Sequence, residues 1–351
     1  MKERQYGLDL YRIMAMLMIT ALHINLQHCN LLNRHISPVG LYYAGLIIEY
    51  VCFAGVNCFA MLSGFLMGNN TGGYDRHWGY RSSSFLLKMV FWGILLYLLV
   101  YFCFPGGREY DFDMRKTVFP FIGFWWYISA YCGVLIFMPL LNTALSKFSK
   151  CDYIVLSVVM LVVFSAIPTY YDNNSGNMIL ANGYSTIWLI ICFIFGAAIK
   201  KLLPEILQIK RITLILILLL LSSVAVPLAV ELLAGKRYME YTTPFCVLEA
   251  ACLLILCSRI KMVDPLWIKI ISFISVNSLG IYLVQNYPYF WEKYIVRHNP
   301  PVYEPLKYLW YLPGVILALM IIGVFSNFAV DKIYRIAGVD RLLRKIFAIK
   351  R

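Results

Sequence analysis

The chain has 351 residues, of which 61% are hydrophobic and 14% are charged, whereas a typical soluble domain is about half apolar and about a quarter charged. This composition excludes a water-soluble globule and indicates an all-α integral membrane protein. The net charge of +13 could indicate nucleic-acid binding, but the basic residues concentrate in short loops between apolar runs. That pattern is typical of membrane orientation and argues against a nucleic-acid partner.

The cysteines give no sign of a metal site or of a disulfide framework. The ten cysteines form no CxxC pair and no cluster with histidine at metal-ligand spacing, and most of them lie inside apolar runs. Buried free thiols that act as small hydrophobic side chains explain this pattern better. We therefore expect no bound metal and no permanently bound cofactor.

The first apolar segment, residues 7–27, carries the ionisable side chains Asp9, Arg12 and His23. Arg12 interrupts its core and no small-x-small cleavage site follows, so the segment is predicted to be a membrane helix and not a signal peptide. Arg12 and His23 are 11 residues apart, which is three helical turns plus roughly 20°. Both should project from one face, about 16 Å apart along the axis. Asp9 precedes Arg12 by three residues and can neighbour it.

A helix needs about 20 apolar residues to cross the hydrocarbon core, and this template predicts ten transmembrane helices. In chain order they cover residues 7–27, 40–67, 82–105, 118–141, 152–168, 183–200, 212–233, 242–259, 268–288 and 309–332. A break is predicted in the second one near "FAGVN", because glycine is a weak helix former. No fixed-period repeat is present, so we expect one membrane domain over residues 1–333 and a basic cytoplasmic amphipathic tail over residues 334–351.

The distribution of Lys and Arg predicts the orientation of the chain, because cytoplasmic loops carry an excess of them. With the N-terminus inside, 21 of these residues lie on the cytoplasmic side and nine on the other. Both termini are therefore predicted to be cytoplasmic. The tail places Leu342, Leu343, Ile346 and Phe347 between basic residues, as in a helix that lies on an anionic membrane surface.

Ionisable side chains inside a membrane are costly, about +2.5 to +3.5 kcal/mol for a central Arg, so they normally face a cavity or a partner. Spacing alone leaves two interpretations of the first helix open. In one, Arg12 and His23 line a functional site. In the other, Asp9 and Arg12 form an interfacial ion pair, and His23 is a hydrogen-bonded interior histidine.

Three further motifs, taken with Arg12 and His23, favour the functional interpretation through a resemblance. They are "VNCFAMLSGFLMG" in the second helix, "FWWYISAYCGVLIFMPLLN" in the fourth and "NSLGIYLVQN" in the ninth. Together and in this order, from about residue 7 to 330, they resemble the acyltransferase 3 family. Its members are bacterial integral-membrane enzymes that O-acylate surface polysaccharides and related acceptors. The resemblance implies a membrane O-acyltransferase.

One position departs from the family pattern. The ninth-helix motif commonly ends in histidine, and here Gln285 stands in that place. Glutamine can orient a group by hydrogen bonds but cannot exchange a proton near neutral pH. His23 is then the only histidine expected inside the membrane and the only candidate for a general base. The other four histidines fall in predicted loops, at His28, His35, His77 and His298.

The resemblance implies acyl transfer from a cytoplasmic acyl-coenzyme A, most simply acetyl-CoA, to a hydroxyl of an extracytoplasmic or lipid-linked cell-surface carbohydrate. His23 would deprotonate that hydroxyl, or its imidazole would be acylated transiently. Arg12 would hold a coenzyme A phosphate or stabilise the thioester oxyanion. The expected location is the bacterial cytoplasmic (inner) membrane, with acyl-CoA as co-substrate. The sequence leaves acetyl against succinyl, the acceptor and the oligomeric state open.

Further polar and aromatic side chains are candidates for the same site. Glu49 could orient His23 or pair with Arg12, or it could be a satisfied polar contact. Asn57 and Ser63 could line the cavity, although a small serine also permits close helix packing. The other candidates for binding substrate or coenzyme A are Asp9, Arg76, Arg81, Trp126, Tyr127, Tyr282 and Gln285. The alternative for Asp9 is an ion pair, and the alternative for Arg76 and Arg81 is the excess of basic residues on the cytoplasmic side. Trp126 and Tyr127 could instead belong to an interfacial aromatic belt.

Two other classes of protein fit parts of the sequence. The main rival is a transporter or flippase of a surface-polysaccharide intermediate, since intramembrane charges suit it too. The sequence has no internal repeat and no pair of interrupted helices in corresponding halves, which counts against alternating access. The second rival is a receptor or scaffold that has lost catalysis, for which Gln285 is the only sign, and the retention of Arg12 and His23 counts against it.

Overall fold

The computed structural model of the chain describes residues 4–29, 31–32, 39–68, 73–171, 180–296 and 305–349. Every regular element in these ranges is a helix. Eight helical stretches among them are long and apolar enough to cross a membrane, or nine if one bent pair of helices also counts as a span. This confirms an all-α, multi-pass membrane protein. The number of ten spans and the cytoplasmic position of both termini stay predictions.

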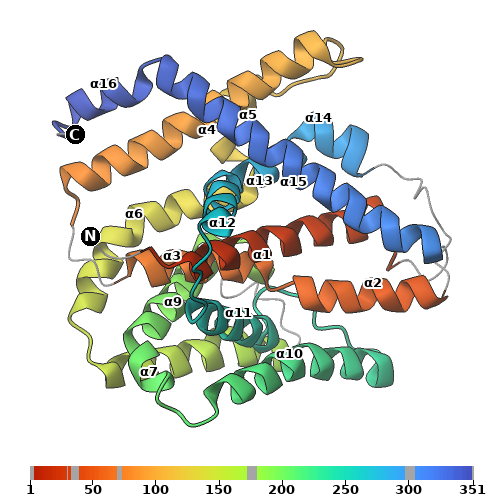
Figure 1. Cartoon of the computed structure of the whole chain (residues 1–351), viewed down its shortest axis with the longest axis vertical. Coiled ribbons are helices and arrows are strands. Elements are labelled where there is room, and N and C mark those ends of the chain that lie inside the picture. The colour runs from red at the N-terminus through yellow and green to blue at the C-terminus, as the bar shows by residue number, and fades with distance from the viewer. Residues whose placement is uncertain are drawn as a thin grey trace.

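Figure 1 shows the arrangement of the elements. In chain order they are α1 (Tyr6–Leu22), η1 (His23–His28), α2 (Val39–Cys52), α3 (Gly55–Met67), α4 (Arg76–Cys103), α5 (Met114–Val118), η2 (Pro120–Ile122), α6 (Trp126–Ser146), α7 (Lys150–Leu161), η3 (Val162–Ala166), α8 (Ile167–Tyr171), η4 (Ala181–Gly183), α9 (Thr186–Ile206), α10 (Ile212–Ala234), α11 (Pro244–Ser258), α12 (Pro265–Asn277), α13 (Leu279–Gln285), α14 (Pro288–Phe290), η5 (Trp291–Ile295), α15 (Pro305–Ile336) and α16 (Val339–Ile346). The elements η1, η3 and η5 are π-helical, whereas η2 and η4 are short 3₁₀ turns.

Each of the ten predicted segments contains a helix, and the main differences lie at the ends. The break near "FAGVN" is confirmed, since α3 begins at Gly55 after a short interruption. Gly55 lies against α1, where a Cβ would stand 3.0 Å from the Ala15 carbonyl oxygen, so the close approach of the two helices needs glycine. The helix of the fourth segment begins at Trp126 and not at residue 118, because Pro120 starts a separate short turn before it.

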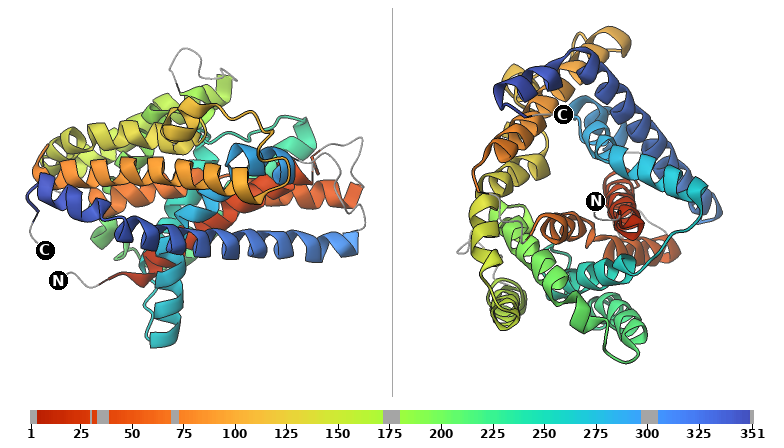
Figure 2. Two further views of the ribbon diagram at one scale, coloured as in Figure 1. Left: turned by 90° about the horizontal axis from the view of Figure 1, so that it is seen from above. Right: turned by 60° about the vertical axis from the view of Figure 1, so that its left-hand side comes forward.

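The predicted ninth span, residues 268–288, is divided into α12 and α13, which meet at an angle of 42°. Figure 2 shows α12 running across the long helices and projecting from the body of the molecule. Gly280 of α13 packs against α15, where a Cβ on Gly280 would be 2.3 Å from the Gly323 carbonyl oxygen. This contact holds α13 inside the bundle after the bend. The bend is not predicted from the sequence.

The helix α1 lies in the middle of the bundle. Of the most apolar 18-residue window within Tyr6–His28, 72% is buried, whereas only 11% of the corresponding window within Lys150–Tyr171 is buried. The helices α2, α3, α11, α12, α13 and α15 all contact α1, and Figure 2 shows it surrounded by later segments. An ionisable side chain on α1 therefore faces protein or a cavity, and not lipid.

Glycines bring α3 and α9 into close contact. A Cβ on Gly64 would stand 1.8 Å from the Phe193 carbonyl oxygen, and one on Gly196 would stand 1.9 Å from the Met61 carbonyl oxygen. Small residues at such positions let two helix backbones approach closely in a membrane protein. This contact fixes α3, which forms one wall of the site described below.

The N- and C-terminal ends of the chain lie at the same end of the molecule (Figure 2). There α16 docks on α4: the Tyr80 hydroxyl donates to the Asp340 carboxylate, which also accepts from Arg344 Nε at 2.8 Å. These two hydrogen bonds, that from Arg344 first, lower the pKa of Asp340. Leu343 is buried in the same contact. The amphipathic tail predicted from the sequence is thus a helix that packs on the start of α4.

Candidate active site

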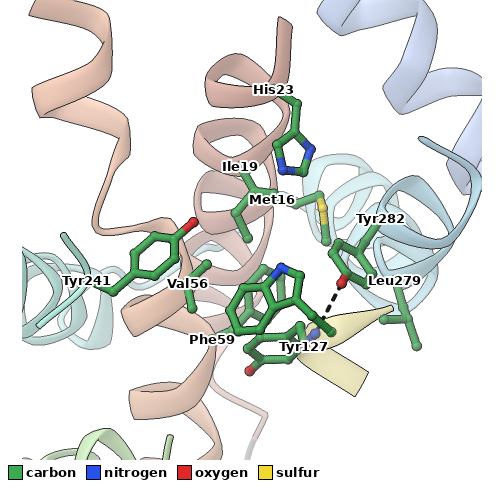
Figure 3. Close-up of a pocket in the computed structure, with 10 residues that line it drawn as sticks. Met16, Ile19, His23, Val56, Phe59, Tyr127, Tyr241, Leu279 and Tyr282 are labelled. Carbon is green, nitrogen blue, oxygen red and sulfur yellow. Dashed lines mark hydrogen bonds between the residues drawn. The ribbon is translucent and has the colours of Figure 1, made fainter. Parts of the chain in front are cut away.

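Arg12, Met16, Ile19 and His23 form one stripe along α1 and the start of η1, at spacings of four, three and four residues. Met16, Ile19 and His23 line one cavity, and Arg12 lines a second one. Figure 3 shows the three stripe residues of the first cavity on the same side of the helix. The face that Arg12 and His23 share therefore opens into cavities inside the protein.

The cavity beside His23, here called the His23 cavity, lies between four helices and one loop. Its free volume is about 30 Å³. The lining is mostly apolar and aromatic with a few polar groups, as in small-molecule sites. Beyond the residues of α1, it is lined by Val56 and Phe59 of α3, Trp126 and Tyr127 of α6, Leu279 and Tyr282 of α13, and Tyr241 of the segment between α10 and α11.

His23 is the first residue of the π-helix η1. Such turns are rare and occur frequently at functional sites. The imidazole stands edge-on to Trp291, with 5.1 Å between the ring centroids. Its Nδ1 atom is buried and has no hydrogen-bond partner among the described residues. A buried polar atom in this state is available to a substrate or to an orienting group.

Gln285, at the end of α13, is 1% exposed, and its amide lies close enough to the His23 imidazole to interact with it. No hydrogen bond of ordinary geometry joins the two, and within the described chain both the amide oxygen and the amide nitrogen lack a partner. Leu279, Tyr282 and Gln285 follow one another at intervals of three residues on one side of α13. Three unsatisfied polar atoms therefore meet beside the His23 cavity.

The π-helix is anchored by Asn25, which is fully buried. Its Nδ2 donates to Glu49 Oε1 at 2.6 Å and to the Gly45 carbonyl oxygen at 3.0 Å, and its Oδ1 accepts from the Tyr308 hydroxyl at 2.8 Å. The Glu49 carboxylate thus bonds Asn25 and neither His23 nor Arg12, which agrees with the alternative of a polar contact in the core and not with a direct role at the site. Through Asn25, Glu49 holds η1 and with it the position of His23.

A second histidine, His28, corrects the expectation that the other histidines lie in loops. It belongs to η1, where Nε2 is 2.6 Å from the Tyr311 hydroxyl and Nδ1 is 3.2 Å from the Ile295 carbonyl oxygen. His77 lies in the first turn of α4. The two remaining histidines, His35 and His298, lie outside the described residues. Of the two histidines in the first span, His23 lines the cavity.

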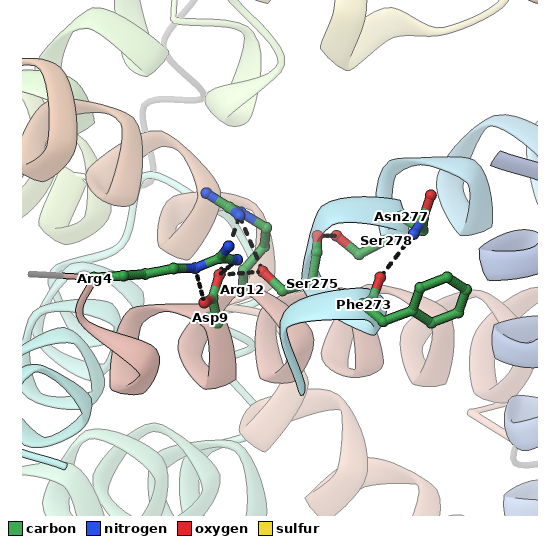
Figure 4. Close-up of polar contacts among 7 residues, drawn as sticks. All are labelled: Arg4, Asp9, Arg12, Phe273, Ser275, Asn277 and Ser278. Atoms are coloured by element: carbon green, nitrogen blue, oxygen red, sulfur yellow. Dashed lines mark hydrogen bonds and ion pairs between the residues drawn. The ribbon is translucent and has the colours of Figure 1, made fainter. Parts of the chain in front are cut away.

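Arg12 belongs to a cluster of polar contacts with α12 and the N-terminal segment (Figure 4). Its Nη1 donates to Ser275 Oγ at 2.9 Å and lies 3.6 Å from Asp9 Oδ1, and the Ser275 hydroxyl donates to the same carboxylate at 2.7 Å. Arg4 also pairs with Asp9, at 2.8 Å. The predicted contact of Asp9 with Arg12 is confirmed. Because two guanidinium groups share one carboxylate, the cluster keeps a net positive charge.

Three cavities adjoin one another in a row. The cavity lined by Arg12, the Arg12 cavity, has a volume of about 210 Å³ and shares Phe59, Tyr127 and Leu279 with the His23 cavity. A third one, the Arg81 cavity, has about 420 Å³ and shares Met67 with the Arg12 cavity. The free volume falls from about 420 to 210 to 30 Å³ along the row. The funnel toward His23 is therefore a feature of the fold, interrupted by the side chains that adjoining cavities share.

The basic side chains at the start of α4 have different surroundings. Arg81 lines the Arg81 cavity together with His77. Arg76 is exposed at the first residue of the helix and is not part of the described lining. Lys88 forms an ion pair with Asp331 of α15. Of the two predicted coenzyme A ligands on α4, the structure brings Arg81 to the row of cavities and leaves Arg76 outside it.

Two hydrogen bonds join the aromatic motif of α6 to α13. Trp125 Nε1 donates to the Leu283 carbonyl oxygen at 3.2 Å, and the Tyr127 amide donates to the Tyr282 hydroxyl at 3.2 Å (Figure 3). Trp126 stacks on Tyr241, with 6.1 Å between the ring centroids and 19° between the ring planes. Trp126, Tyr127 and Tyr282 therefore form a wall of the His23 cavity.

Asn57 has a different place from the one predicted. It is fully buried and lines none of the three cavities. Its Nδ2 donates to the Tyr241 carbonyl oxygen at 2.8 Å, and its Oδ1 accepts from Trp188 Nε1 at 2.9 Å. It thus positions Tyr241, which does line the His23 cavity. Ser63 lines the Arg12 cavity as predicted, and its hydroxyl donates to the Phe59 carbonyl oxygen at 3.1 Å.

Sequence reasoning missed several residues of this region, among them Asn25, Ser275, Tyr308, Trp291 and Tyr241. Asn25 could have been noticed, because this amide stands two residues after His23 in the same predicted membrane helix. The other four come from distant segments, and their spacing carries no signal that they meet α1 or η1.

The side chains at the site can exchange a proton at His23 and hold negative charge at Arg12. All ten cysteines are free thiols. In the part of the chain that the structure describes, no three His, Cys, Asp or Glu side chains come close enough together to hold a metal ion.

Fold and site together define a helical membrane protein in which a row of narrowing cavities ends at an imidazole. The model of the acyltransferase 3 family, described as an acyltransferase domain, matches residues 5–327. The chain therefore belongs to this family and is a membrane acyltransferase. No curated protein and no solved structure is significantly similar to it.

Proposed function

We propose that this acyltransferase moves an acyl group, most simply acetyl, from acyl-coenzyme A on the cytoplasmic side to a hydroxyl of an extracytoplasmic or lipid-linked cell-surface carbohydrate, in the inner membrane of a bacterium. The observation that carries the proposal is the row of three cavities from Arg81 past Arg12 to His23. Tyr241, on the loop after α10, lies at the far end of this row. A donor and an acceptor from opposite sides would meet at His23.

The distance between Arg12 and His23 decides which role suits Arg12. Eleven residues of helix separate them by about 16 Å along the axis. A group that stabilises an oxyanion must lie about 3 Å from it. If the thioester reacts at His23, Arg12 is too far away for that role. We therefore assign it to a coenzyme A phosphate, for which the cluster with two guanidinium groups and one carboxylate supplies the positive charge.

The chemistry at His23 begins with a neutral imidazole that accepts the proton of the acceptor hydroxyl. The hydroxyl oxygen attacks the carbonyl carbon of the thioester, and the tetrahedral intermediate expels the coenzyme A sulfur. The imidazolium returns its proton to the leaving thiolate, so the histidine is regenerated. The alternative, transient acylation of the imidazole followed by transfer to the hydroxyl, uses the same position and stays open.

Gln285 has a role in this scheme that does not require proton exchange. A small rotation of its amide would let Oε1 accept a hydrogen bond from Nδ1–H of His23, and both atoms are unsatisfied now. That bond would fix the tautomer in which Nε2 is free to act as the base. The narrowing of the free volume toward His23 also supports a short acyl group.

The test is the variant His23→Gln, which keeps hydrogen-bonding capacity but removes proton exchange. We expect acylation of surface glycans, measured by mass spectrometry, to fall at least about 100-fold, while purified protein still binds acetyl-CoA. Normal acylation by a well-folded His23→Gln protein would refute the role of His23. Wild-type protein that neither binds acetyl-CoA nor slowly hydrolyses its thioester would refute the proposal as a whole.

The matched control is His28→Gln, five residues further along η1. The glutamine can still bond the Tyr311 hydroxyl, and His28 does not line the His23 cavity. We expect this variant to acylate glycans within about threefold of wild type. An equal loss in both variants would mean that the π-helix, and not the His23 imidazole, is what the substitution disturbs.

A further inference from the structure

A second kind of cavity lies in the corner where α12 crosses α15. Its volume is about 360 Å³, at the lower end of the range of small-ligand sites. It shares no lining residue with the row of cavities that leads to His23. Four of its residues belong to α12 and four to α15, namely Ser272, Phe273, Val276, Asn277, Phe328, Asp331, Lys332 and Arg335.

The corner carries an excess of positive charge. Its carboxylate, Asp331, already forms an ion pair with Lys88 of α4. The next carboxylate along the chain, Asp340, is paired within α16. Lys332 and Arg335 both line the cavity and are exposed. Lys332 Nζ also lies over the Phe328 ring, 4.6 Å from its centroid, a contact that leaves the charge in place. The charges of both side chains are therefore available to an anion.

The cavity also holds an unused hydroxyl. Ser272 Oγ is buried and has no hydrogen-bond partner among the described residues. Asn277 is already engaged, since its Nδ2 donates to the Phe273 carbonyl oxygen (Figure 4) and its Oδ1 accepts from Asn327. One hydroxyl donor and two cations thus face the same space, which is the donor set that a phosphate group needs.

Apolar side chains flank this polar corner. Phe273, Val276 and Phe328 line the cavity and are 36%, 55% and 38% exposed. Further along α12, Leu266 and Trp267 are 63% and 59% exposed, and Figure 2 shows the helix projecting from the body of the protein. Exposed tryptophan and leucine on a helix that lies across the spans are typical of the boundary between headgroups and acyl chains.

We propose that the corner between α12 and α15 binds an anionic phospholipid, with the phosphate of its headgroup at Lys332, Arg335 and Ser272 and an acyl chain along Phe273 and Phe328. Basic pockets between membrane helices on the cytoplasmic side are suited to anionic headgroups. A soluble phosphate ester would satisfy the cations but would leave the aromatic flank uncovered. The inference does not depend on the reaction proposed above.

Native mass spectrometry of the purified full-length chain tests the proposal, with phosphatidylglycerol and phosphatidylcholine of the same acyl chains as probes. We expect phosphatidylglycerol to bind more tightly than phosphatidylcholine. The double variant Lys332→Gln/Arg335→Gln should weaken phosphatidylglycerol binding about thirtyfold, roughly fivefold for each cation, and leave phosphatidylcholine binding unchanged. Equal binding of both lipids, or undiminished binding by this variant, would overturn the proposal.

Two further arms separate the alternatives. The control is the double variant Arg108→Gln/Lys236→Gln, which removes the same charge outside the corner. These two cations also lie over aromatic rings, those of Tyr101 and Tyr238. The control should bind phosphatidylglycerol like wild type. Ser272→Trp fills the cavity without a change of charge and should weaken binding. If millimolar inorganic phosphate displaces the lipid, the site recognises soluble phosphate and the lipid assignment is wrong.

Discussion

Arg12 and His23 lie on one stripe of the first span, but their surroundings satisfy them to different degrees. Arg12 is held by Ser275 and Asp9, so its guanidinium is fixed in place and keeps a net positive environment. His23 has a buried Nδ1 without a partner. A fixed cation suits the binding of a charged group, whereas an unsatisfied imidazole suits proton exchange. This difference supports the proposed division of roles, in which Arg12 binds a charged group and His23 acts in the chemical step.

The variant Arg12→Lys tests this division. Lysine keeps the charge but loses the planar fork that can hold a phosphate and Ser275 together. We expect the KM for acyl-CoA to rise about tenfold while kcat changes by less than about threefold, measured by steady-state kinetics of purified protein. Arg76→Lys, at an exposed site on α4, should leave both constants unchanged. A fall in kcat at constant KM would place Arg12 in the chemical step.

At the scale of single residues, the sequence predicted the features that one helix determines by its own geometry. It did not predict the contacts that residues of one helix make with another helix. The common face of Arg12 and His23 follows from helix geometry alone, because both lie on the same segment. The contact of Glu49 with Asn25 could not be predicted, because Asn25 and its other partner Tyr308 come from segments that are separate from α2. For the same reason Asn57 was assigned to the cavity, although it supports Tyr241 from behind.

The elements show where local rules of helix formation are sufficient. The length of the apolar segments predicted the membrane helices, and the low helix propensity of glycine predicted the break between α2 and α3. The bend between α12 and α13 had no such signal, because "SVNSLG" contains no proline and the bend depends on the contact of Gly280 with α15. Contacts between helices, and not local propensity, decided that part of the fold.

The contact of α3 with α9 yields a prediction about stability. In Gly64→Val the new side chain meets the Phe193 carbonyl oxygen, which is backbone and cannot rotate away. The two helices must separate, which costs roughly 1–3 kcal/mol. We expect a lower midpoint of thermal unfolding in detergent, followed by light scattering or fluorescence. The control is Gly314→Val on α15, where a Cβ would meet no atom within 4 Å; an equal loss there would contradict the argument.

At the scale of the molecule, ends of helices that are far apart in the sequence gather at one end of the bundle. Lys150 at the start of α7 pairs with Glu205 near the end of α9, and Tyr80 of α4 bonds Asp340 of α16. This end also carries the N- and C-terminal segments and the wide Arg81 cavity. If the excess of basic residues places it in the cytoplasm, the row of cavities opens toward the pool of acyl-CoA.

Epitope tags test this orientation. A tag at the C-terminus should bind antibody only after the cells are permeabilised. A tag inserted between Gly106 and Gly107, in the turn after α4, should be accessible on intact spheroplasts, because α4 separates this turn from the end that carries the C-terminus. The reverse pattern would contradict the cytoplasmic position of the termini and the proposed entry of acyl-CoA from the cytoplasm.

The central place of α1 has a consequence for how the protein is made. The helix α1 carries side chains that are costly in a membrane, and the serine that bonds Arg12 is synthesised 263 residues later. The tyrosine that secures the turn after His23 follows its asparagine by 283 residues. During most of translation α1 must therefore wait in the translocon or the bilayer with its own ion pair of Asp9 and Arg12 but without its later partners, so the site can assemble only when the last third of the chain has been inserted.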